Sequence, residues 1–121
     1  MHVLYVGRHQ YLRDHVVRMW TEFGVDTDGW VGLDDRARGE APPPASRYDA
    51  VLCDYDLLAS MTPEQCADLP ALRNTPIIAT SLNHREDEVP VLGLPGVVGF
   101  LYLPELTRET ALAAIEEGRL R

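Results

Sequence analysis

Residues Tyr48-Asp49-Ala50-Val51-Leu52-Cys53-Asp54 contain a short continuous apolar run that ends on a carboxylate. Such a run is typical of a strand that is buried on both faces of a parallel sheet. Four more apolar runs lie along the chain, with segments of helical periodicity between them. The five expected strands are residues 3–6, 25–31, 50–53, 76–79 and 97–103. This alternation predicts a three-layer α/β domain with five parallel strands and helices on both faces.

Helices are predicted in the segments between these runs. Apolar residues recur at spacings of three and four over residues 12–23, and Gly24 can end that helix in a left-handed cap. The sequence Thr62-Pro63-Glu64-Gln65 has the form of a capping box and predicts a helix that begins at Pro63. Consecutive prolines at 42–44 shorten the helix before them. The expected helices are residues 12–23, 33–40, 63–70 and 107–118, with a short or absent helix in residues 89–96.

The composition is that of an ordinary globular protein. With 121 residues, 45% hydrophobic and 25% charged, the chain can form a core without metal or disulfide support, and we expect a single domain over residues 1–121. The 11 Lys and Arg against 19 Asp and Glu leave a net charge of −8, which disfavours nucleic acid or a membrane as a direct partner. Cys53 and Cys66 form no CxxC motif and are expected as reduced core thiols of a cytoplasmic protein. The four histidines show no metal-binding spacing.

Three stretches, in this order, resemble the receiver domains of response regulators in two-component signalling. Residues 48–54 resemble the run that ends in the phosphoacceptor aspartate, and residues 75–81 (TPIIATS) resemble the fourth strand, which ends in a hydroxyl residue. Residues 96–104 (GVVGFLYLP) are similar to the glycine-led fifth strand that ends in Lys-Pro. The resemblance spans the chain and implies a flavodoxin-like, receiver-like strand order. It implies a phosphoacceptor position at Asp54, a phosphoryl-contact position at Ser81 and an aromatic switch position at Phe100.

The sequence departs from the family at the positions that carry the chemistry. In receivers, an acidic pair after the first strand helps the phosphoacceptor to hold Mg²⁺, and a lysine before the proline pairs with the phosphoryl group. Here the acidic pair is replaced by Gly7 and Arg8, and the lysine by Leu103. We therefore predict that the Mg²⁺ site is lost, that no cofactor is bound, and that Arg8 forms an ion pair with Asp54 in place of the metal and the lysine. Asp56 is a candidate residual acid.

The expected function is signal transduction through protein–protein contact, independent of phosphorylation and without catalytic turnover. The expected partner is a histidine kinase, another signalling protein or an effector domain. A homodimer is expected to form through the fourth crossover, the fifth strand and the last helix. Apolar residues gather there, and the expected contact strip is Val89, Val91, Leu92, Leu94 and Val97.

Two alternatives stay open from the sequence. The first is a working phosphoacceptor in a phosphorelay, in which Asp54 is phosphorylated and Asp56 helps to rebuild an Mg²⁺ site. The second is a small-molecule sensor in which Arg8 holds an anion in the emptied crevice. For the individual residues a purely structural role is the competing interpretation: Asp54 in an ion pair, Ser81 as a loop hydroxyl, and Phe100 in apolar packing.

Overall fold

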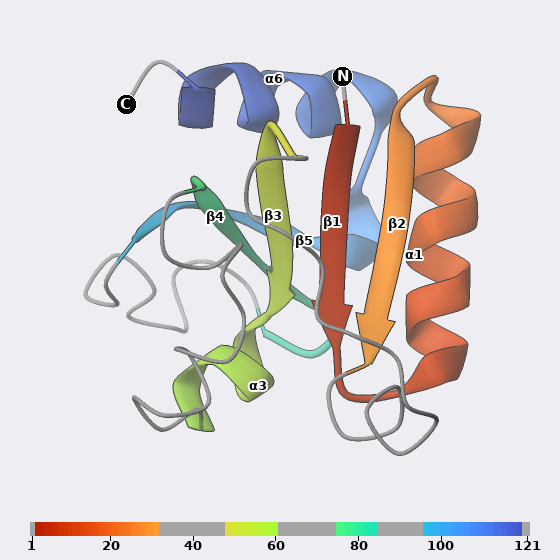
Figure 1. Ribbon diagram of the computed structural model, residues 1–121, viewed down its shortest axis with the longest axis vertical. Coiled ribbons are helices and arrows are strands. Elements are labelled where there is room, and N and C mark those ends of the chain that lie inside the picture. Colours follow the sequence, from red (N-terminus) through yellow and green to blue (C-terminus); the bar gives the residue numbers. More distant parts are fainter. Residues whose placement is uncertain (1, 32–47, 61–74, 85–95, 120–121) are drawn as a thin grey trace.

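The computed structural model describes residues 2–31, 48–60, 75–84 and 96–119, which form a five-stranded parallel sheet with helices packed on it (Figure 1). The strand order is β2-β1-β3-β4-β5, with every neighbouring pair parallel. This is the predicted fold class. The strands are β1 (His2–Gly7), β2 (Asp26–Val31), β3 (Ala50–Asp54), β4 (Ile77–Ser81) and β5 (Val97–Tyr102). The helices are α1 (Gln10–Glu22), α3 (Tyr55–Ser60), the short 3₁₀ helix η4 (Leu103–Glu105) and α6 (Arg108–Arg119).

The central strands are buried on both faces of the sheet. Every residue of β3 and of β4 is buried, as expected for continuous apolar runs in a parallel sheet. On one face, here the α1/α6 face, buried strand residues pack with Val16 and Trp20 of α1 and with Ala111 and Ile115 of α6. On the opposite face, here the α3 face, a second apolar cluster packs against Leu57 and other residues of α3.

All five predicted strands are present, with small shifts at their ends. The fourth begins at Ile77 after Pro76, and the fifth ends at Tyr102. Leu103 was expected in that last strand but instead begins η4, because Pro104 has no N–H to continue the strand ladder.

Two predicted helices are confirmed. The first, α1, is followed by Gly24 at a φ of 88°, in the left-handed region that glycine tolerates. The last, α6, is capped by Thr107, whose hydroxyl oxygen accepts the N–H of Thr110 at 3.2 Å. The helices expected at residues 33–40 and 63–70, most of the segment 89–96 where a short or absent helix was expected, and Cys66 lie outside the described residues. Cys53 is buried and forms no disulfide within the described part of the chain, as expected for a core thiol.

Helix α3 was not predicted. It begins at Tyr55, directly after Asp54, whereas the sequence indicated a later helix start. The physical reason is that Asp54 acts as its N-cap: a carboxylate oxygen, Oδ1, accepts the N–H of Asp56, two residues on, at 3.4 Å. The end of β3 is thereby joined to a helix without an intervening loop.

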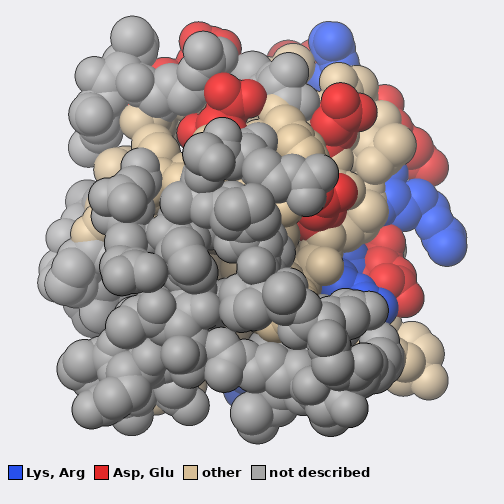
Figure 2. Space-filling view, viewed as in Figure 1, with Lys and Arg blue, Asp and Glu red and all other residues tan. Residues whose placement is uncertain are grey.

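The described surface carries mixed charge. Figure 2 shows acidic and basic side chains side by side over α1, where Arg13 and Asp14 form an exposed ion pair. Of the expected contact strip, only Val97 lies within the described residues, and it is 8% exposed and part of the apolar cluster on the α3 face. None of the helices in the described part of the chain is long and apolar enough to cross a membrane.

Candidate functional site

The candidate site lies at the carboxyl ends of three neighbouring strands. Val6 is the register partner of Cys53, and Asp54 is the register partner of Thr80. Gly7 therefore ends β1 beside Asp54, the last residue of β3, and Asp54 lies beside Thr80, the residue before the last one of β4. In open parallel sheets this edge is the usual place for a functional crevice.

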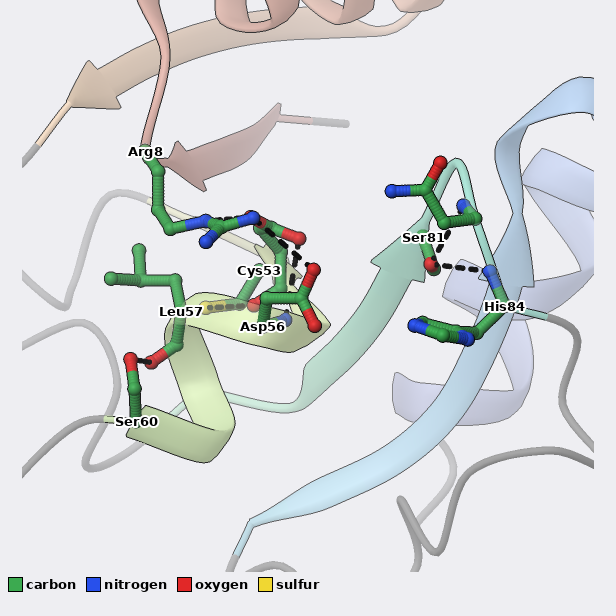
Figure 3. A network of polar contacts seen from close by, with 9 residues as sticks. Arg8, Cys53, Asp56, Leu57, Ser60, Ser81 and His84 are labelled. Carbon is green, nitrogen blue, oxygen red and sulfur yellow. Dashed lines mark hydrogen bonds and ion pairs between the residues drawn. The ribbon is translucent and has the colours of Figure 1, made fainter.

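Arg8 binds two carboxylates at this edge. Its Nε donates to Oδ2 of Asp54 at 2.9 Å, and its Nη2 donates to Oδ2 of Asp56 at 3.1 Å (Figure 3). The ion pair between Arg8 and Asp54 was predicted from the sequence and is confirmed. The second contact, with Asp56, was not predicted. A planar guanidinium with its donors in a fixed fork can bind two carboxylates at once, which a lysine ammonium does less well.

The two carboxylates differ in their exposure to solvent. The side chain of Asp54 is 10% exposed, whereas those of Asp56 and Arg8 are 36% and 43% exposed. Burying a carboxylate as deeply as that of Asp54 costs free energy unless its oxygens accept hydrogen bonds. Both of its oxygens are engaged, Oδ2 by Arg8 and Oδ1 by the N–H of Asp56.

Ser81 ends β4 and is 4% exposed. Its hydroxyl oxygen accepts the backbone N–H groups of Asn83 at 3.1 Å and His84 at 3.0 Å, so it stabilises the turn that follows the strand (Figure 3). The ring of His84 lies edge-on to the ring of Tyr55, with centroids 6.4 Å apart. This contact joins the turn after β4 to the start of α3. A phosphoryl contact by Ser81 stays a prediction.

The other two positions implied by the resemblance are apolar. Phe100 is partly buried and packs against the apolar cluster on the α3 face. Leu103 is 6% exposed and belongs to the cluster on the α1/α6 face. Neither side chain brings charge to the strand ends. The direct contacts of the site are those among Arg8, Asp54 and Asp56.

The role of Tyr5 was not predicted from the sequence. A Cβ atom at Gly7 would lie 2.6 Å from Cε1 and 2.9 Å from the hydroxyl oxygen of Tyr5, so the phenol ring covers the backbone of Gly7. The hydroxyls of Tyr5 and Thr80 are buried and have no hydrogen-bond partner within the described residues. Burial raises the pKa of Tyr5 well above its usual range. The nearby Asp54 and Cys53 raise the pKa of this phenol further, while the positive charge of Arg8 opposes the rise.

These residues do not fit a divalent cation such as Mg²⁺. That ion requires several free oxygen ligands in octahedral geometry. Within the described ranges, no group of three or more His, Cys, Asp or Glu side chains is placed to hold a metal ion. The carboxylates of Asp54 and Asp56 at the strand ends are both paired with the guanidinium of Arg8.

The strand order and the polar edge together define a three-layer α/β domain of the flavodoxin-like class. No family model and no curated protein matches the chain, but solved structures do. The receiver domain of a sensor histidine kinase from Pseudomonas aeruginosa, with a magnesium ion coordinated in its active site cleft, is 19% identical. The match has a TM-score of 0.60 and covers 99% of this chain and 98% of that one.

Two other solved structures show the same architecture. A two-component response regulator from Clostridium difficile is 14% identical, with a TM-score of 0.62 over 100% of this chain and 97% of that one. A putative pilus assembly protein from Burkholderia thailandensis is 15% identical, with a TM-score of 0.64 over 100% and 99% of the two chains. The fold is receiver-like, as the sequence stretches predicted.

Proposed function

We propose that this protein is a receiver-like signalling domain that acts by binding another protein, without phosphoryl transfer to Asp54. The observation that carries the proposal is the double ion pair of Arg8 with Asp54 and Asp56. The chain has the fold of receivers, and at the carboxyl ends of its strands the guanidinium of Arg8 forms ion pairs with two carboxylates.

Phosphoryl transfer to an aspartate needs a free carboxylate oxygen as nucleophile and a cation that offsets the charge of the incoming phosphoryl group. In this site both oxygens of Asp54 already accept hydrogen bonds. A divalent cation would in addition meet the positive charge of Arg8, which like-charge repulsion disfavours. These points speak against the phosphorelay alternative, which needs Asp54 and Asp56 free for the metal.

The anion-sensor alternative needs the opposite arrangement, with Arg8 free to bind a ligand. Nε and Nη2 of Arg8 are instead occupied by Asp54 and Asp56. An incoming anion would have to bind the remaining N–H groups of Arg8 beside these two carboxylates, whose negative charges repel it.

The ion pairs support a domain that holds one conformation. Arg8 follows β1, Asp54 ends β3, and Asp56 lies in the first turn of α3. One side chain therefore links three elements. We infer that partner binding is controlled by expression, location or an attached domain, and that the chain is a non-enzymatic module of one domain.

Two large apolar side chains near this edge are exposed to solvent. Among the described residues, the exposed large hydrophobic side chains are Tyr11, at 83%, and Leu82, at 44%. Tyr11 lies in the first turn of α1, just after β1, and Leu82 follows β4. Single exposed apolar side chains are common on protein surfaces, and these two are the ones that a partner bound at this edge would cover. A histidine kinase, another signalling protein or an effector domain is the proposed partner, with β5 and α6 as the proposed homodimer surface.

The test uses beryllofluoride, which mimics a phosphoryl group on an aspartate, in the presence of millimolar Mg²⁺. Amide chemical shifts around Asp54 and Ser81 and the fluorescence of Trp20 and Trp30 are followed. We expect no change beyond that seen with Mg²⁺ alone. Saturable shifts at Asp54 and Ser81 that are absent in an Asp54→Asn variant would overturn the proposal.

A further inference from the structure

The ring of Tyr5 fills the space above Gly7 at the end of β1. Residues 5 and 7 lie on the same face of the strand because side chains alternate between faces. A Cβ at Gly7 would come within 3.0 Å of three atoms of the phenol ring, namely Cε1, Cζ and the hydroxyl oxygen. Contacts this short do not occur between a real Cβ and its neighbours, so either the ring or the backbone would have to move.

The ring is held in place by the core. Tyr5 is fully buried and belongs to the apolar cluster on the α1/α6 face, which also contains Val16 and Trp20 of α1. Protein cores are close-packed, so a buried ring cannot swing aside as an exposed side chain can. The clash at position 7 is therefore not relieved by a simple side-chain rotation.

Position 7 is the place where a further carboxylate would have to stand. It follows Val6, the register partner of Cys53, and so lies beside Asp54. An aspartate there would add a second carboxylate next to that of Asp54, which is the kind of ligand set that a hard divalent cation requires. The phenol brings an uncharged hydroxyl instead.

We propose that Tyr5 closes this end of the sheet to divalent cations, because its ring occupies the space that an acidic side chain at position 7 needs. Restoring acids at positions 7 and 8 is then not enough to create a cation site. The inference rests on the proposed function and deepens it: cation binding is excluded by core packing as well as by the ion pairs of Arg8.

The direct test measures Mn²⁺ binding by calorimetry and by the loss of free-ion paramagnetic resonance signal. Wild-type protein, a Gly7→Asp/Arg8→Asp variant and a Tyr5→Leu/Gly7→Asp/Arg8→Asp variant are compared. We expect one-site Mn²⁺ binding in the triple variant, at least tenfold tighter than in the double variant. Equal binding by the double and triple variants, or no binding by a folded triple variant, overturns the inference.

A second measurement needs no metal and tolerates destabilised variants. Gly7→Ala is introduced into wild-type and into Tyr5→Leu protein, and the thermal midpoint is followed. We expect Gly7→Ala to lower the midpoint in the wild-type background and to leave it almost unchanged in the Tyr5→Leu background, since the two sites are coupled through one contact. Gly99→Ala is the matched control, because a Cβ at Gly99 of β5 would meet its nearest atom only at 4.0 Å.

The outcomes separate this inference from the proposed function. Equal lowering of the midpoint by Gly7→Ala in both backgrounds shows that the ring does not obstruct position 7, and overturns the role of Tyr5. Wild-type protein that binds Mn²⁺ through Asp54 overturns the proposed function. Wild-type protein that does not bind, together with a double variant that binds Mn²⁺ as tightly as the triple variant, overturns the role of Tyr5 alone.

Discussion

Arg8 and Asp54 are joined by a hydrogen-bonded ion pair, with 2.9 Å between Nε of Arg8 and Oδ2 of Asp54. The pair connects the residue after β1 to the last residue of β3. Removing one partner of such a pair leaves the other buried and unpaired, which costs more than the pair contributes as a whole. Asp54 is the more buried partner. Removal of Arg8 should therefore lower the stability of the fold, because it leaves the buried carboxylate without its charged donor.

Arg8→Ala is expected to lower the free energy of unfolding by about 1–3 kcal/mol, because a mostly buried carboxylate loses its charged donor. Urea unfolding followed by Trp fluorescence measures the change. The control is Asp14→Ala, which breaks the exposed ion pair with Arg13 and should change stability by no more than about 0.5 kcal/mol. An Arg8→Ala protein as stable as wild type would show that the ion pair between Arg8 and Asp54 does not stabilise the fold.

Arg8→Lys is expected to recover only part of the loss. An ammonium group can pair with Asp54 but does not have the planar fork that binds Asp54 and Asp56 together. Unfolding of the Lys and Ala variants side by side gives the comparison. A Lys variant equal to wild type would mean that the contact with Asp56 contributes nothing.

Asp54 has a second role, as the N-cap of α3, which Asp54→Asn and Asp54→Ala distinguish. Both substitutions remove the ion pair, but asparagine keeps an oxygen that can accept the N–H of Asp56. We expect the Asn variant to be more stable than the Ala variant by about 1 kcal/mol. Equal stability would show that the long contact of 3.4 Å does not cap the helix.

Ser81→Ala should destabilise the turn after β4, because the backbone N–H groups of Asn83 and His84 lose their acceptor. The expected cost is about 1–2 kcal/mol in the free energy of unfolding. Ser60→Ala serves as the matched control, since Ser60 makes an exposed contact with its own helix and its loss should cost less than about 0.5 kcal/mol. If the two variants lose the same amount, the structural role assigned to Ser81 is wrong.

The raised pKa of Tyr5 predicts a loss of stability in alkaline solution. In the unfolded chain this phenol ionises near its ordinary pKa of about 10, whereas in the folded protein burial keeps it protonated. The stabilisation is complete below pH ~10 and is lost as the pH rises, at up to about 1.4 kcal/mol per pH unit.

Comparison with Tyr5→Phe isolates this effect from the other four tyrosines. The Phe variant loses only a buried hydroxyl without a described partner, so it should match or exceed the wild type at pH 7. Above pH ~10 its stability should fall less steeply than that of the wild type, while the exposed Tyr11→Phe variant should follow the wild type. Parallel curves for wild type and Tyr5→Phe would refute the prediction.

Much of the sheet could be predicted from the sequence because its strands are short apolar runs between segments of helical period. The ion pair of Arg8 with Asp54 could be predicted too, since parallel strands end at the same edge and the two charges are opposite. The contact with Asp56 could not, because it depends on α3 beginning directly after Asp54. That early start depends on a capping contact that the apolar pattern does not reveal.

The contact between Tyr5 and Gly7 was missed although a signal was present. A large aromatic residue two positions before a glycine places both on one face of the strand. Which way the ring leans is decided by the packing of α1 over β1, and no local pattern in the sequence reports it. The sequence shows that position 7 carries no acid. It does not show that the ring of Tyr5 occupies the space beside Gly7.

Whether Asp54 accepts a phosphoryl group is tested most directly by the intact mass of the protein after incubation with acetyl phosphate and Mg²⁺. Wild-type and Asp54→Asn proteins are measured together, with a phosphorylatable receiver as the positive control for the reagent. We expect no phosphoryl group on the wild-type protein under conditions that modify the control. A mass gain of one phosphoryl group in the wild type that disappears in Asp54→Asn would contradict it.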